Sequence, residues 1–198
     1  MTLDEFSRRL KSAAQRVIDS EAELTEIDSH FGDADHGVTM TKIAGAIAGA
    51  GGDTFKALLD DAAMGVMMIN GGSAVPLWNT WLDGLQEAAP DAAEADADKL
   101  KGMFSAALAS LSSLSKAKVG DKTMMDALIP ATEALTGCTG SEEEMFAAAA
   151  EAARAGTEAS RNFVSKFGRA RSYGEQTIGT PDAGAVSMCS FFEGLAKA

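Results

Sequence analysis

The sequence predicts an all-α protein folded as a single domain over residues 1–198. Alanine is very abundant, whereas the strand-favouring residues Val, Ile, Tyr and Trp are few. Apolar residues make up 46% of the chain, enough for a sizeable core, and they recur at helical spacing along most of it. There is no internal repeat period. The pattern therefore favours a bundle or ring of about eight helices.

The first four helices are separated by short polar or glycine-bearing breaks. Thr2 and Glu5 fit a capping box at the start of the first helix. The second is expected to end at Gly51-Gly52, and Asp53-Thr54 is expected to cap the third. The expected helices cover residues 3–24, 37–50, 55–67 and 74–85.

The last four helices follow an acidic loop over residues 87–97. Ser141 and Glu144 form a second capping box, and Pro130 is expected to kink the helix that contains it. The expected helices cover residues 97–115, 124–131, 142–166 and 185–195. Between the last two lies a glycine-rich segment, residues 167–184, which is too long for an idle connection and is predicted to be functional.

The net charge of −12 limits the partners of this chain. Binding of nucleic acid needs a basic surface, and so does binding to an anionic membrane, so we expect neither partner. A chain this acidic can still bind a nucleotide if metal ions neutralise the contact locally.

The two cysteines and the N-terminus indicate a cytoplasmic protein. Cys138 and Cys189 form no CxxC pair, and we interpret them as reduced core thiols. The N-terminus is charged from its start and lacks the apolar stretch of a secretory signal. No run approaches the ~18–20 apolar residues of a membrane span.

The most informative stretch is IDSHFGDADHG, residues 27–37, which holds Asp28, Asp33 and Asp35. Like charges this close repel one another unless a cation lies between them, and Mg²⁺ prefers carboxylate and phosphate oxygens. The stretch predicts a metal–phosphate site. A solvated acidic turn is the alternative. An EF-hand is rejected because its twelfth loop position, which requires Glu, holds Ala44.

Three glycine-bearing breaks lead directly into helices, whose N-termini offer free N–H groups to phosphate. They begin at His36, Gly71 and Gly179. Plain connections are the alternative for each. The His36 ring could donate to a phosphate oxygen or only fix its loop. Arg169 could clamp a phosphate with two hydrogen bonds or lie at the surface beside Arg171.

Four segments of this chain resemble the L subunit of dihydroxyacetone kinase, the nucleotide-binding component, in the order of that family. They are residues 24–40 (LTEIDSHFGDADHGVTM), 70–80 (NGGSAVPLWNT), 120–126 (GDKTMMD) and 168–185 (GRARSYGEQTIGTPDAGA). The GDADHG string, with an Asp five residues before its first Asp, is highly specific. Together the four segments span nearly the whole chain.

The resemblance implies an eight-helix barrel with ADP or ATP and two Mg²⁺ ions bound at one end. It implies that Asp28, Asp33 and Asp35 are the metal ligands. It also implies that His36 and Arg169 act on the transferred phosphoryl group. The nucleotide-binding residues that it implies are His36, Gly37, Val38, Thr39, Gly72, Ser73, Ala74, Met124, Arg169, Asp182, Ala183 and Gly184.

Two segments depart from the usual pattern of this family. Gly-Gly-Ala-Ser-Gly-Pro is here Gly-Gly-Ser-Ala-Val-Pro, residues 71–76, so the hydroxyl has moved and Val75 replaces a glycine. Asp-Pro-Gly-Ala is here Asp-Ala-Gly-Ala, residues 182–185. These changes suggest a divergent branch acting on another short ketose, such as a tetrulose.

The resemblance also implies how the chain would act. The ketose would be held by a separate K subunit, and a phosphohistidine protein of the sugar phosphotransferase system would recharge the bound nucleotide. The alternatives are an ATP-dependent ketose kinase subunit and a non-catalytic Mg-nucleotide-binding regulatory module. A second copy of the chain is a further potential partner, as a homodimer.

Overall fold

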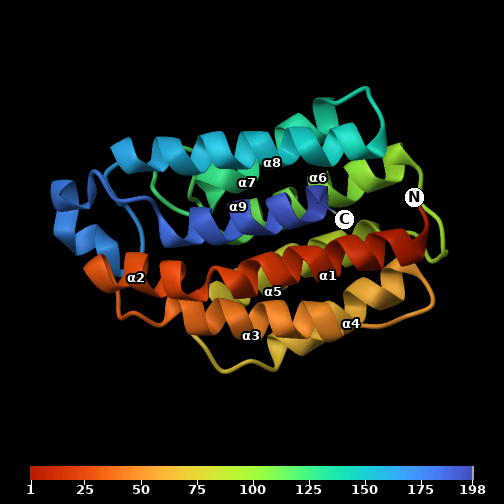
Figure 1. The fold of residues 1–198 in the computed structure, drawn as a ribbon, viewed down its shortest axis with the longest axis horizontal. Helices are drawn as coiled ribbons and strands as arrows, with labels where there is room; N and C mark the ends of the chain where they lie inside the picture. Colours follow the sequence, from red (N-terminus) through yellow and green to blue (C-terminus); the bar gives the residue numbers. More distant parts are fainter. Residues whose placement is uncertain (198) are drawn as a thin grey trace.

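The computed structural model describes residues 1–197, and within them the predicted all-α architecture is confirmed. This part of the chain holds nine α-helices and two 3₁₀ segments, and no strand (Figure 1). The α-helices are α1 (Leu3–Asp19), α2 (Glu21–Phe31), α3 (His36–Gly49), α4 (Phe55–Met67), α5 (Ala74–Ala88), α6 (Ala97–Leu114), α7 (Met125–Gly137), α8 (Glu142–Ala159) and α9 (Ala183–Ala196). The 3₁₀ segments are η1 (Ser160–Asn162) and η2 (Arg169–Thr177).

Eight of these helices form a closed ring, as expected for a barrel. Each of α3 to α8 packs on the next helix along the chain, and α9 packs on α1, which in turn packs on α3. The remaining helix, α2, contacts α3, α9 and η2. It lies at one end of the elongated molecule, away from the N-terminus (Figure 1). Within residues 1–197, no helix combines the length and apolar character needed to cross a membrane.

The core is centred on α9, which packs on α1, α7 and α8. Phe191 of this helix meets Trp78 and Trp81 of α5 edge-on, with ring centroids 5.3 and 5.5 Å apart. Edge-to-face pairs of this kind add to the stabilisation from burial alone. These contacts fix α9 against α5, so the N-termini of both helices are held in place at the same end of the ring.

The first expected helix is two helices in the structure. Chain direction changes at Ser20, whose Oγ donates to the Arg16 carbonyl at 2.8 Å and also lies 3.1 Å from Ser190 Oγ. A serine hydroxyl that bonds the backbone in this way competes with helix continuation. Asp28 therefore lies in the last turn of α2, and the expected helix over residues 3–24 is corrected to α1 and α2.

The C-terminal boundary of α8 also differs from the prediction. The helix expected over residues 142–166 ends at Ala159, because η1 follows and Ser160 Oγ bonds back to Thr157 O at 2.6 Å. The helix α7 continues through Pro130 to Gly137. The predicted capping residues Thr2, Thr54 and Ser141 each accept a backbone N–H, and the Ser141–Glu144 capping box is complete.

Candidate functional site

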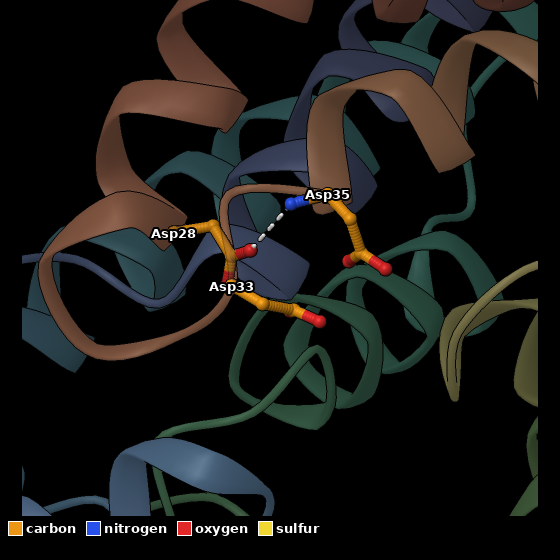
Figure 2. A group of neighbouring side chains, drawn as sticks. All are labelled: Asp28, Asp33 and Asp35. Carbon is orange, nitrogen blue, oxygen red and sulfur yellow. Dashed lines mark hydrogen bonds between the residues drawn. The ribbon is translucent and has the colours of Figure 1, made fainter.

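Three clustered carboxylates lie where α2 gives way to α3. Asp28 lies in the last turn of α2, Asp33 lies in the loop, and Asp35 immediately precedes α3 (Figure 2). Carboxylate oxygens from all three lie within 4.8 Å of one another. Asp28 Oδ2 accepts hydrogen bonds from the backbone N–H of Asp35 at 3.1 Å and of His36 at 3.4 Å. Asp28 thus fixes the loop that carries the other two carboxylates.

The loop between Asp28 and Asp35 depends on two small residues. A side chain on Gly32 would place its Cβ 2.0 Å from Asp28 Oδ1, so only glycine leaves room for that carboxylate. Ala34 has a φ of 60°, in the left-handed region that residues with a Cβ rarely adopt. Strained backbone of this kind is typical of ligand sites.

The charges in this loop favour a bound cation. Burial raises the pKa of Asp35 above its usual range, and the neighbouring charges of Asp33 and Asp28 raise it further. An all-oxygen donor set of this density suits a hard divalent ion such as Mg²⁺. The residues present therefore fit the metal that the sequence predicts.

Arg169 and Tyr173 hold η2 against α2. The Arg169 guanidinium forms an ion pair with Asp33 Oδ2. The ring of Tyr173 meets the Phe31 ring edge-on, with centroids 5.2 Å apart. The glycine-rich segment expected to be functional is thus anchored next to the carboxylates, and it presents a cation there.

A cleft of about 280 Å³ extends from the carboxylates between the N-termini of α3, α5 and α9. Most of the expected site residues line it, namely Asp28, Asp33, Asp35, His36, Thr39, Gly72, Ser73, Ala74, Met124, Arg169, Asp182, Ala183 and Gly184. Segments widely separated in the sequence thus meet in one cleft.

Two expected nucleotide-binding residues do not line this cleft. Gly37 is buried against α2, and a Cβ there would lie 2.3 Å from Glu21 O, so its lack of a side chain allows α3 to approach α2. Val38 is exposed, and it too lies outside the cleft lining. A phosphate role for either residue stays a prediction that concerns the backbone.

The His36 side chain has a partner on α9. Its Nε2 lies 3.2 Å from Ser187 Oγ, and that hydroxyl donates to Gly184 O at 2.9 Å. Burial lowers the pKa of His36, which favours the neutral ring. With the Ser187 proton engaged, the consistent arrangement has Nε2–H donating to Ser187 Oγ. The ring donor expected to reach a phosphate thus links α3 to α9.

The wall formed by α9 begins at Asp182, the N-cap residue of this helix. Asp182 Oδ2 accepts from Ala185 N at 2.8 Å. Burial raises the pKa of Asp182 to about 7, with a further contribution from the charge of Asp126. Gly184 packs directly beside Met124, since a Cβ on Gly184 would lie 3.3 Å from Met124 Cβ.

Sequence reasoning missed several residues of the cleft. Lys122 and Thr123 line one side, and Ser165 lies near them. Phe31, Leu77 and Trp78 supply apolar surface. Apolar residues at helical spacing look like ordinary core, and a lysine in a turn looks like surface. All of them except Ser165 lie in the segments that carry the family resemblance, but that resemblance assigned them no role.

Residues 30–197 match the family model described as DAK2 domain. The chain belongs to this family. The resemblance to the L subunit of dihydroxyacetone kinase is thereby confirmed over most of the sequence, including three of the four segments in full and most of the fourth.

Among curated relatives of this DAK2-domain chain is a D-erythrulose kinase of Mycolicibacterium smegmatis. It is 34% identical over 191 residues, which cover 92% of this chain and 33% of that protein. Another is the PEP-dependent dihydroxyacetone kinase 2, ADP-binding subunit DhaL, of Listeria innocua. It is 32% identical over 188 residues, which cover 88% of this chain and 87% of that protein. The chain thus spans about a third of the length of the erythrulose kinases that it matches, and most of the length of the DhaL subunit.

The fold is shared with the native dihydroxyacetone kinase of C. freundii. The TM-score is 0.77 at 24% identity, over 97% of this chain and 34% of that one. The same enzyme in complex with AMP-PNP and Mg²⁺ gives a TM-score of 0.73. At this level of identity the likeness concerns the fold, and the eight-helix ring is accordingly a known architecture.

Proposed function

We propose that this chain is the nucleotide-binding phosphotransfer component of a kinase for dihydroxyacetone or a related short ketose, such as erythrulose. The observation that carries the proposal is the joining of three carboxylates and three helix N-termini in one cleft. Carboxylates suit Mg²⁺, and helix N-termini suit phosphate. The names of the relatives supply the class of acceptor.

In this proposal Asp28, Asp33 and Asp35 hold two Mg²⁺ ions together with ADP or ATP. Bound Mg²⁺ would supply neutralisation of the charge that develops on the transferred phosphoryl group. Backbone N–H groups at the starts of α3 and α5 would bind and orient the phosphates. Arg169 lines the same cleft as the carboxylates, and its guanidinium would add a positive charge near the transferred phosphoryl group.

The chain itself supplies positioning rather than a nucleophile, because the attacking hydroxyl belongs to the ketose. We propose that the ketose is held by a K subunit or K domain that docks at the open cleft. Activity then requires both components. Phosphoryl transfer of this kind depends chiefly on alignment and electrostatics. The Ser187 hydroxyl beside His36 donates to Gly184 O, so in this proposal that pair has a structural role.

For the phosphoryl source we propose a phosphohistidine protein of the phosphotransferase system. Its support is that two relatives matched over most of their length are PEP-dependent ADP-binding subunits. The alternative is direct use of ATP by an erythrulose kinase, favoured by relatives named for that substrate. Both phosphoryl sources are cytoplasmic, so we propose that this protein acts in the cytoplasm.

Two measurements test the proposal. Mass spectrometry of small molecules released from the denatured pure protein is expected to show an adenine nucleotide. The purified chain is then incubated with its K partner, a ketose and ATP. Multiple turnovers without any phosphohistidine donor would establish the ATP route instead, whereas absence of transfer from either donor would contradict a kinase role.

A further inference from the structure

Lys122 is a buried lysine with an unfavourable backbone conformation. It is 4% exposed and has a φ of 59°. A residue with a Cβ rarely adopts this left-handed region, and it persists where the surrounding structure fixes it. Such outliers cluster at ligand sites, and Lys122 does line the cleft. The backbone conformation of Lys122 and its place in the cleft lining together indicate a role in the site.

The Lys122 ammonium joins two segments that are distant in sequence. Its Nζ donates to Ser160 O at 2.7 Å and to Thr180 O at 2.5 Å. Ser160 follows α8, whereas Thr180 lies just before α9. Burial lowers the pKa of Lys122, while the charges of Asp182 and Asp126 favour its protonated form. The ammonium thus spans the gap between the loop before α7 and the segment that leads into α9.

The loop that carries Lys122 is held rigidly by its own bonds to α7. Asp126 Oδ1 accepts from Gly120 N and Asp126 Oδ2 from Thr123 N, both at 2.6 Å. Asp126 is fully buried. Hydrogen bonds to a buried carboxylate are strong because competing water is excluded. The loop is therefore a fixed support, and Lys122 connects it to the segment before α9.

The two segments that Lys122 connects also carry two neighbouring residues of the cleft lining, Met124 and Gly184. Met124 lies two residues after Lys122, and Gly184 lies four residues after Thr180. A Cβ on Gly184 would come 3.3 Å from both Met124 Cβ and Met124 N, so the two residues pack directly against each other. A shift of Thr180 away from Lys122 would separate them.

We infer that Lys122 is a positioning residue that holds Met124 and the start of α9 together, and that the surface formed by these two segments receives the base of the nucleotide. The inference rests on the proposed nucleotide-binding function. It places the effect of Lys122 on the base, because the carboxylates and the α5 N-terminus, which would hold the diphosphate, make no contact with its ammonium.

The test compares Lys122→Met and Lys122→Gly with the wild-type chain by calorimetric titration. The glycine variant also lacks the ammonium but accepts the left-handed backbone, so it guards against a variant that fails to fold. Lys118→Met, an exposed lysine of the same loop, is the matched control. The ligands are Mn²⁺ alone, Mg-pyrophosphate and Mg-ADP.

For both Lys122 variants we expect Mg-ADP to bind about tenfold more weakly, with the affinities for Mn²⁺ and Mg-pyrophosphate unchanged. Hydrogen exchange should accelerate at residues 178–184 and stay unchanged at residues 32–35. Equal losses for Mg-ADP and Mg-pyrophosphate would overturn the inference, as would an unchanged affinity for Mg-ADP. A wild-type chain that binds Mn²⁺ but no nucleotide would overturn the proposed function as well.

Discussion

The guanidinium of Arg169 forms an ion pair with the carboxylate of Asp33. Asp33 belongs to the acidic loop between α2 and α3, whereas Arg169 opens η2, far along the chain. The pair brings the glycine-rich segment to the proposed metal site. A cation so close to the clustered carboxylates can also reach the phosphates that a metal would hold.

Replacing Arg169 by alanine should slow phosphoryl transfer more than it weakens nucleotide binding. The side chain would act on charge that develops in the transition state, so its loss should lower kcat about a hundredfold while the dissociation constant for Mg-ADP changes far less. Steady-state kinetics with the K partner and titration with Mg-ADP measure the two effects. Arg171→Ala, an exposed neighbour on η2, is the control and should change neither. A larger loss in binding than in kcat would assign Arg169 to ground-state binding.

Asp33→Asn and Asp35→Asn should each abolish nucleotide retention, because each removes a charge that would ligate the metal. The nucleotide that co-purifies with each variant is quantified after denaturation. Asp91→Asn, an exposed change in the loop before α6, should retain wild-type levels. Stoichiometric nucleotide in Asp33→Asn would show that the ligand assignment is wrong.

Ionisation of Asp182 should lower the free energy of unfolding as the pH rises from about 4 to about 7. Its pKa is raised to about 7 in the folded chain, against about 3.9 when unfolded. In this window the folded state holds the proton and the unfolded state has lost it, so raising the pH favours unfolding. This loss of stability is complete once the pH exceeds the pKa of Asp182 in the folded chain.

The measurement is the difference in Tm between Asp182→Asn and the wild type at pH 5 and pH 8. Asparagine can still cap α9, so the substitution isolates the ionisation. We expect the variant to gain stability relative to the wild type at pH 8. An identical difference at both values would mean that Asp182 titrates as an ordinary exposed carboxyl.

Gly156→Ala should destabilise the pairing of α7 with α8. Pro130 has no N–H to donate to the Asp126 carbonyl, and that oxygen faces Gly156, where a Cβ would lie 1.9 Å away. Relieving such a clash requires the helices to move apart, at a cost of about 1–3 kcal/mol. Chemical denaturation of both proteins gives the change in free energy of unfolding.

Gly102→Ala is the control for this substitution. It lies on the exposed face of α6 with no atom within 4 Å of the added Cβ, so it should stabilise the chain by about 0.5–1 kcal/mol. If Gly156→Ala and Gly102→Ala changed the free energy of unfolding by the same amount, the close approach of α8 to Asp126 O would not affect stability.

Local patterns predicted the helices well where a cap or glycine stop lies in the sequence, as at Thr54 and Ser141. They failed at Ser20, because the α1–α2 break depends on a hydroxyl that meets Ser190 on α9. They failed again at Ala159, because Ser160, which follows α8, accepts hydrogen bonds from Lys122 before α7 and from Asp182 before α9. Boundaries set by partners distant in sequence leave no local pattern.

The same distinction applies to the candidate site. The clustering of Asp28, Asp33 and Asp35 was predictable because short spacing alone brings them together. The partner of His36 on α9 and the cross-link made by Lys122 were not, since each joins residues far apart along the chain. Gly37 looked like a phosphate contact, but its neighbours in the fold explain its small size.

The closure of the helical ring by α9 on α1 has a consequence for the synthesis of this protein. Ala183 and Gly184, which form one side of the cleft, belong to α9, which is synthesised after α1 to α8. A nascent chain that has already exposed its acidic loop still lacks the surface beside Met124. Since pairing of distant segments comes late in folding, cofactor capture must await the synthesis of α9 and its packing on α1.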